Sequence, residues 1–251
     1  MSDIVLTLSD VVVAFDALRA VNGVSLTVPR GQRRAIIGPN GAGKTTLFNA
    51  VTGVLPPTAG RIEFDGRDIT RLPPHKRARL GISRTFQITN LFPSLSIAEN
   101  MVLAMRGLSP RKFSLFGTPA TTSQEADRIA AALSGARLSG RTAVKVKELS
   151  YGEQRQLELA LALVTDPRML LLDEPAAGLS AAERAMLAGI IRALPPELTI
   201  ILIEHDMDLA LGLVDYVTCL HEGRVLIEAT PQGIRSNAMV QEVYLGTPRH
   251  A

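Results

Sequence analysis

The chain has 251 residues, which is long enough for one large domain or two modest ones and excludes a disulfide-stapled miniprotein. Apolar residues make up 46% and charged residues 20% of the sequence, a composition typical of globular and not of disordered proteins. The net charge of only +3, the few aromatic residues and the absence of Trp argue against a nucleic-acid-binding protein. No apolar run reaches the length of a membrane-spanning helix and no signal peptide is evident, so we expect a soluble, unsecreted chain.

The beginning of the chain predicts an antiparallel sheet. Runs rich in β-branched and apolar residues occur at 4–8, 11–13, 24–28 and 62–64. The dipeptide Asp65-Gly66 after the last of them indicates a hairpin turn. Between these strands, residues 34–37 form a short apolar run that ends in glycine and leads into a helix-forming stretch. The sequence therefore predicts a strand, a loop and a helix at this point.

The middle of the chain predicts helices, whereas its end predicts a parallel sheet. Between about residues 70 and 165 we interpret no segment as a strand, and residues 126–136 form an Ala-rich amphipathic segment. The later elements are apolar runs at 169–172 and 199–203, a helix-like segment at 181–194 and two further strands at 216–220 and 224–227. Alternation of buried strands with helices is typical of an α/β core. We expect one α/β core with a helical insertion.

A phosphate-loop motif lies between the strand at 34–37 and the helix that follows. It reads Gly38-Pro39-Asn40-Gly41-Ala42-Gly43-Lys44-Thr45. Its glycines allow backbone N–H groups to surround an anion, the helix adds its positive end, and Lys44 can reach the β- and γ-phosphates. Thr45 would bind Mg²⁺. A glycine-rich structural turn is the alternative, but the complete motif in its strand-to-helix context favours nucleotide binding.

Two carboxylates follow the buried strand at 169–172. Asp173 and Glu174 lie at its carboxyl end, the edge at which open α/β sheets bind ligands. Asp173 would bind Mg²⁺ through water, and Glu174 would orient or deprotonate the water that attacks a phosphate. Such a pair can also be the start of a solvated loop. The phosphate loop, whose lysine lies 129 residues earlier, favours the catalytic interpretation.

A second anion-binding candidate is the segment 149–155, which reads Leu-Ser-Tyr-Gly-Glu-Gln-Arg. It places Ser150 and Gly152 at the start of a helix-compatible stretch, where backbone N–H groups attract anions. The segment resembles the LSGGQ signature of ATP-binding cassette (ABC) proteins. A capping serine before an ordinary helix is the other interpretation.

The order of the motifs resembles the ABC family from end to end. Gln87 resembles the Q-loop glutamine, and His205 resembles the switch histidine. Phe15 occupies the place of the aromatic residue that packs against adenine, although a core position is an equal alternative. Flanking strings resemble LivG-type ATPase subunits of branched-chain amino acid importers, at 81–87, 95–100, 149–155, 173–179, 203–207 and 243–246.

Several positions, including Leu161 in place of an arginine after the signature, depart from the general ABC pattern. Tyr151 replaces the first glycine of the signature and Glu153 replaces its glutamine, which leaves Ser150 and Gly152 as the anion-binding pair. Ser180 stands where many relatives have the D-loop aspartate. We therefore expect the coupling between two ATP sites to differ from that in relatives with the aspartate.

The resemblance implies a single ABC ATPase domain over residues 1–251. Its P-loop NTPase core would carry an antiparallel β subdomain, a helical subdomain inserted over approximately 88–165, and a short tail over approximately 230–251. ATP and Mg²⁺ are the implied cofactors. The implied reaction converts ATP and water to ADP and phosphate, coupled to transport across a membrane.

The resemblance also assigns roles to individual residues. Glu174, His205 and Gln87 would form the catalytic set, in which His205 contacts the γ-phosphate together with Lys44. The magnesium ion and its waters would be held by Thr45, Gln87 and Asp173. The ATP-binding set is Phe15, Gly38, Pro39, Asn40, Gly41, Ala42, Gly43, Lys44, Thr45, Thr46, Ser150 and Gly152. Ser150 and Gly152 would complete the ATP site of a second subunit.

The implied partners are transmembrane permease subunits and a second ATPase, either a copy of this chain or a LivF-like homologue. A periplasmic or extracellular binding protein would act indirectly, and no nucleic acid is expected as a partner. The chain would lie peripherally on the cytoplasmic face of the plasma membrane. Three alternatives remain: the ATPase of lipopolysaccharide export, an ABC ATPase acting on DNA, and a scaffold that binds nucleotide without cleaving it. The short spacing from Lys44 to Asp173, without a heptad repeat, disfavours the DNA-acting class.

Overall fold

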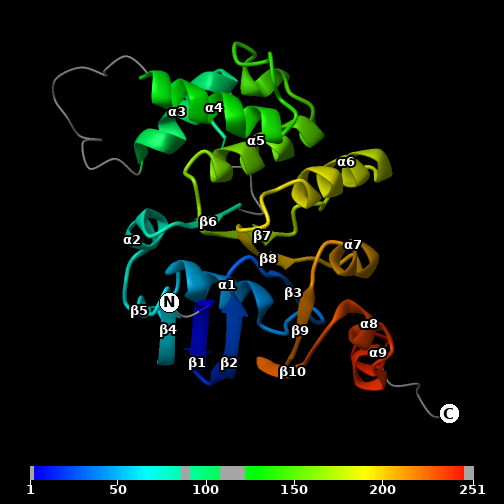
Figure 1. Cartoon of the computed structure of the whole chain (residues 1–251). Helices are drawn as coiled ribbons and strands as arrows, with labels where there is room; N and C mark the ends of the chain where they lie inside the picture. Colours follow the sequence, from blue (N-terminus) through cyan, green and yellow to red (C-terminus); the bar gives the residue numbers. More distant parts are fainter. Residues whose placement is uncertain (1–2, 86–90, 108–121, 246–251) are drawn as a thin grey trace.

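The structure is a computed structural model that describes residues 3–85, 91–107 and 122–245 (Figure 1). The strands are β1 (Ile4–Phe15), β2 (Leu18–Pro29), β3 (Arg33–Ile37), β4 (Ala59–Phe64), β5 (Arg67–Asp68), β6 (Ile82–Arg84), β7 (Met169–Asp173), β8 (Thr199–Ile203), β9 (Tyr216–His221) and β10 (Arg224–Ala229). The helices are α1 (Lys44–Thr52), α2 (Pro74–Arg79), α3 (Ile97–Gly107), α4 (Ser123–Gly135), the 3-10 helix η1 (Val146–Glu148), α5 (Tyr151–Leu163), α6 (Ala181–Arg192), α7 (Met207–Leu211), α8 (Pro231–Arg235) and α9 (Ala238–Leu245).

The first sheet is antiparallel, with the strand order β2-β1-β4-β5. The two strand-forming runs at 4–8 and 11–13 belong to the single strand β1, whose register shifts between Leu8 and Val11. The predicted turn Asp65-Gly66 joins β4 to β5, and both residues have positive φ, 51° and 71°. Asp and Gly tolerate that conformation better than most residues, which explains why this dipeptide marks the hairpin.

The second sheet has the order β10-β9-β3-β8-β7-β6, and only β10 in it pairs antiparallel. Every residue of β7 and β8 is buried, which is why both read as unbroken apolar runs. The prediction that no strand lies between residues 70 and 165 is wrong, because β6 pairs with β7 at the sheet edge. Its three residues include Ser83 and Arg84, so hydrophobic periodicity could not reveal it.

Helices α3, α4 and α5 form a separate layer, seen at the top of Figure 1 away from the antiparallel sheet. They enclose their own apolar cluster, which includes Ile97, Met101, Leu133 and Leu157. Helices α4, α5 and α6 each begin with a capping box, in which a Ser or Thr and a Glu three residues later satisfy each other's backbone N–H groups. The starts of these helices are therefore fixed by local sequence.

The C-terminal helices α8 and α9 pack against the parallel sheet. Ile234 and Val240 are buried in the cluster that also contains residues of β7 and β8. The hydroxyl of Tyr244 in α9 accepts a hydrogen bond of 2.5 Å from the backbone N–H of Gly38. The end of the chain thus contacts the loop that follows β3.

Candidate nucleotide-binding site

The predicted phosphate loop connects β3 to α1. Gly38, Gly41 and Gly43 have φ of 149°, 81° and 96°, values that favour glycine. A Cβ at Gly38 or Gly43 would lie 2.2 Å from a backbone oxygen, of Leu220 and Ala20 respectively. The loop can therefore turn tightly against these neighbours only with glycine at both positions.

Helix α1 begins at this loop with its backbone N–H groups available to a ligand. In the described chain, Gly43 gives the helix no side-chain cap, and the first turn has no acidic residue. Lys44 is 6% exposed, and its Nζ donates to the carbonyl oxygens of Gly38 (2.7 Å) and Pro39 (2.9 Å). Burial lowers the pKa of Lys44, while the nearby Glu174 opposes this effect. The helix end and the ammonium group together favour an anion such as phosphate.

A cavity of about 370 Å³ brings the loop together with residues distant in sequence. Its lining residues are Phe15, Leu18, Ala20, Asn40, Gly41, Ala42, Gly43, Lys44, Thr45, Thr46, Glu174 and His205. Phe15 is 46% exposed, so the alternative interpretation of Phe15 as a core residue is wrong. An exposed aromatic ring at a phosphate-binding cavity offers a flat apolar face to a nucleotide base.

Glu174 and His205 meet at the edge of this cavity. Glu174 Oε1 and His205 Nε2 are 2.7 Å apart, and the carboxylate is more buried than the imidazole. The two residues come close because β7 and β8 are adjacent parallel strands that end at the same edge. Glu174 has a φ of 48°, and its backbone N–H donates to Ile203 at 2.9 Å. The backbone of Glu174 is thus held in an uncommon conformation.

Glu204 connects the segments that carry Glu174 and His205. Its carboxylate accepts hydrogen bonds from the backbone N–H groups of Ala176 (2.9 Å) and His205 (3.2 Å). Glu204 is buried, and this burial raises its pKa. Sequence reasoning gave Glu204 no role, since its importance depends on the backbone groups that surround it. An acid directly after a fully buried strand is the signal in the sequence that could have revealed it.

Asp173, at the end of β7, uses only one of its two carboxylate oxygens in hydrogen bonds to described residues. Its Oδ2 accepts from Arg84 Nη2 at 2.5 Å, and Arg84 also donates to Asn49 of α1 at 2.6 Å. Oδ1 is buried and has no hydrogen-bond partner among the described residues. An unpaired carboxylate oxygen is unusual in a protein interior and is the kind of ligand that Mg²⁺ prefers. Asp173 and the hydroxyl of Thr45, which lines the cavity, therefore have the oxygen chemistry that a magnesium site requires.

Ser150 and Gly152 lie at a different cavity, of about 410 Å³, next to α6. The Ser150 hydroxyl accepts a hydrogen bond from the N–H of Glu153, so the serine does cap its helix. Within this chain the structure does not bring Ser150 and Gly152 to the phosphate loop. Gln87 lies outside the described residues.

The comparisons with known proteins identify the family of this chain. Residues 21–177 match a family model described as ABC transporter. The chain belongs to the ABC transporter family.

Its similarity to individual ABC proteins extends over nearly its full length. The chain is 42% identical to the high-affinity branched-chain amino acid transport ATP-binding protein BraF of Pseudomonas aeruginosa, covering 98% of this chain and 99% of BraF. It is 40% identical to the corresponding protein LivG of Escherichia coli, with the same coverage. A crystal structure of an ATP-binding cassette in its ADP conformation superposes with a TM-score of 0.87, 30% identity and coverage of 98% of this chain and 100% of that chain. The predicted fold class and the resemblance to LivG-type subunits are confirmed.

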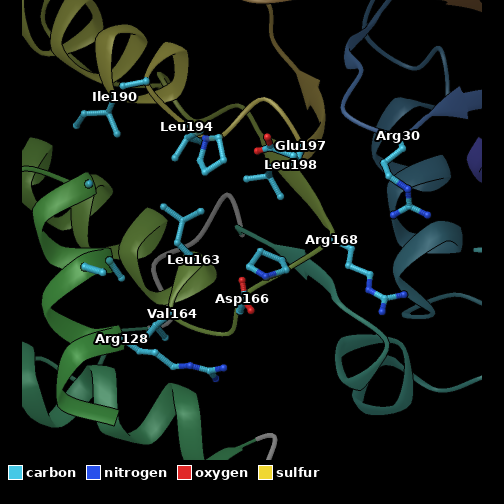
Figure 2. A pocket seen from close by; sticks show the side chains of 16 residues that line it. Arg30, Arg128, Leu163, Val164, Asp166, Arg168, Ile190, Leu194, Glu197 and Leu198 are labelled. Carbon is cyan, nitrogen blue, oxygen red and sulfur yellow. The ribbon is translucent and has the colours of Figure 1, made fainter. Parts of the chain in front are cut away.

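Two further features of this ABC protein lie away from the phosphate loop. None of the helices within residues 3–85, 91–107 and 122–245 has the length and apolar character needed to cross a bilayer. A larger cavity, of about 690 Å³, lies where α4, α5 and α6 come together, with Leu163, Leu194 and Leu198 on its wall and Arg128 and Asp166 beside them (Figure 2). None of the predicted site residues lines it, so cavity size does not locate the nucleotide site.

Proposed function

We propose that this chain is the ATP-hydrolysing subunit of an ABC importer for branched-chain amino acids or related small amides. The observation that carries the proposal is the single cavity that combines the phosphate loop, the exposed ring of Phe15 and the pair Glu174–His205. Similarity over 98% of the chain to proteins named for branched-chain amino acid transport supports the cargo. The same similarity favours this role over lipopolysaccharide export, DNA-directed work and binding without hydrolysis.

The phosphate loop and Lys44 bind the triphosphate of ATP. Backbone N–H groups at the start of α1 surround the phosphates, and Lys44 supplies a full positive charge from within the loop. Phe15 packs against the adenine ring. Asp173, Thr45 and Gln87 would hold Mg²⁺, whose charge would offset that of the phosphates.

Glu174 and His205 carry the hydrolysis step. Glu174 takes a proton from a water molecule as the water oxygen attacks the γ-phosphorus, and the bond from this phosphorus to the β–γ bridging oxygen breaks. His205, 2.7 Å from the Glu174 carboxylate, holds that carboxylate in place and contacts the γ-phosphate. Phosphoryl transfer depends mainly on positioning and charge, which this pair and Lys44 supply.

A second ATPase subunit completes the site. Ser150 and Gly152 lie at a separate cavity of this chain, which supports their action on the ATP of the partner, either a copy of this chain or a LivF-like homologue. Permease subunits bind the dimer at the cytoplasmic face of the membrane, and an external binding protein delivers the cargo. Closure of the dimer around two ATP molecules and its release after hydrolysis drive the permease.

The variant Glu174→Gln tests the assignment. It keeps the size of the side chain but removes the proton acceptor, so we expect unchanged ATP binding and phosphate release slower by roughly 100- to 10,000-fold. The variant should also accumulate as an ATP-bound dimer in size-exclusion chromatography. Phosphate release by the variant at a nearly normal rate would refute the assigned base.

The cargo is tested by reconstituting the chain with its permease and binding protein in vesicles. ATP-dependent uptake of labelled leucine, isoleucine or valine is the expected result, and uptake of acetamide or urea instead would assign the amide branch of the proposal. A complex that hydrolyses ATP but takes up none of these compounds would refute the proposed cargo. Salt-sensitive DNA binding by the purified chain would favour the alternative of an ABC ATPase that acts on DNA.

A further inference from the structure

Tyr151 contacts the segment that follows the catalytic glutamate. It is the first residue of α5 and stands between Ser150 and Gly152. Its hydroxyl donates to the backbone oxygen of Ala177 at 3.2 Å. Its ring packs on Gly178, where an added Cβ would lie only 3.1 Å from the ring. Tyr151 thus joins residues 150–152, which we call the signature turn, to the loop between Glu174 and α6.

Gly152 makes a second connection, to the start of the helix α6 that follows this loop. A Cβ at Gly152 would lie 2.4 Å from Glu183 Oε1, so the backbone approaches this carboxylate closely. Hydrogen bonds from Ser180 and from the backbone of Gly152 hold the pKa of Glu183 below its ordinary value. Residues 150–152 therefore contact both the loop, at Ala177, and the first turn of α6, at Glu183.

The side chain of Tyr151 also contacts the buried ion pair Arg155–Glu158. Arg155 Nη2 donates to the Tyr151 hydroxyl at 2.7 Å, and the guanidinium carbon lies 5.1 Å from the ring centroid. Arg155 Nη1 donates to Glu158 at 2.8 Å, and both side chains are more than nine-tenths buried. A side chain restrained on two sides transmits a displacement better than a free one.

Only a few bonds separate Tyr151 from Glu174. Ala177, whose oxygen accepts from Tyr151, donates its own N–H to the backbone oxygen of Glu174 at 3.1 Å. The neighbouring Ala176 N–H is held by Glu204 at 2.9 Å. A movement of the signature turn therefore reaches the backbone of Glu174 through Ala177, while Glu204 keeps the loop attached to the core.

We propose that Tyr151 is a positioning residue that couples the two ATP sites of the dimer. The inference rests on the proposed function, in which Ser150 and Gly152 bind the ATP of the partner while Glu174 acts on the ATP of its own chain. Binding of the partner's ATP fixes the signature turn, and Tyr151 passes this change to Glu174. Hydrolysis at one site then depends on occupancy of the other.

The first experiment compares Tyr151→Phe with the unmodified chain in phosphate release as a function of ATP concentration. Phenylalanine keeps the ring on Gly178 but loses the bonds to Ala177 and Arg155. Of these two bonds only the one to Ala177 reaches the loop after Glu174, so we expect kcat to fall by roughly two- to tenfold, as for the loss of one hydrogen bond, with the Hill coefficient falling toward 1. Tyr216→Phe is the matched control, because the Tyr216 hydroxyl has no hydrogen bond among the described residues.

The second experiment uses mixed dimers of differently tagged copies, in which one protomer carries Glu174→Gln and only the other hydrolyses ATP. Tyr151→Phe is placed either in the protomer that keeps Glu174 or in the protomer that has lost it. We expect the loss of activity only in the first arrangement, since Tyr151 acts on the Glu174 of its own chain. A purely structural tyrosine, or one acting across the interface, would not give this asymmetry.

The outcomes separate the inference from the function on which it rests. Equal losses in both arrangements, or an unchanged Hill coefficient together with a lower melting temperature, would overturn the coupling role of Tyr151 and leave the ATPase intact. An unmodified chain that releases no phosphate with its partners would reject the proposed function and the inference with it.

Discussion

Replacing Tyr244 with Phe tests how the C-terminal helix holds the phosphate loop. In the structure the Tyr244 hydroxyl accepts a hydrogen bond of 2.5 Å from the N–H of Gly38, and phenylalanine leaves this donor without a partner. Leaving a buried donor unsatisfied costs about 1–3 kcal/mol. For a chain of this size, each kcal/mol lowers the melting temperature by about 2–4 °C.

Urea unfolding and thermal melting of the nucleotide-free protein measure this loss. The control is Tyr216→Phe, because the Tyr216 hydroxyl makes no hydrogen bond to the described residues. This substitution should change the free energy of unfolding by less than about 0.5 kcal/mol. Equal effects of the two substitutions, or a loss below 0.5 kcal/mol for Tyr244→Phe, would refute the argument that α9 stabilises the loop.

The pH dependence of the same variant provides a second measure. Burial raises the pKa of Tyr244 to about 12, above its value near 10 in an unfolded chain. A group with a raised pKa contributes stability that is complete below the unfolded pKa and is lost as the pH rises through the folded pKa. The advantage of the unmodified protein over Tyr244→Phe should therefore be constant below about pH 10 and shrink between about pH 10 and 12. A difference that grows over this range would contradict the assignment.

Two further substitutions address the loop and the buried acid. Gly43→Ala places a Cβ 2.2 Å from the Ala20 oxygen and should abolish binding of a fluorescent ATP analogue. Gly41→Ala also strains a φ of 81° but has open space around its Cβ, so it should weaken binding less, and equal affinities of the two variants would refute the steric argument. Burial raises the pKa of Glu204, so this group lowers the stability of the unmodified protein as the pH rises above the ordinary value of this pKa. Glu204→Gln removes the group, and the variant should gain stability relative to the unmodified protein as the pH rises in urea titrations; a growing deficit would contradict this.

The sequence predicted best those parts of the site whose conformation is determined locally. The glycines of the phosphate loop specify backbone angles that few other residues adopt, and Asp173 and Glu174 follow a strand recognisable from its apolar run. The capping serine considered at position 150 is equally local. In each case the residues that determine the conformation are neighbours in the sequence.

Other features could not be predicted because they depend on pairing between distant segments. Strand β6 exists only because residues 82–84 pair with β7, and Arg84 gains its role only when Asp173 and Asn49 are placed beside it. Similarly, the alternatives for Phe15 could be separated only by the exposure of its ring.

The placement of Ser150 and Gly152 agrees with the proposal that one chain alone is an incomplete enzyme. They stand at a second cavity next to α6, while the phosphate loop, Glu174 and His205 form the first cavity. If each of these two cavities bound a nucleotide independently of the other, no physical connection between the two half-sites would be needed. Yet Tyr151, Ala177, Glu183 and Gly152 join the two regions through hydrogen bonds and close packing. A link between separated half-sites is useful when each responds to a different ATP molecule, which is the condition of a head-to-tail dimer.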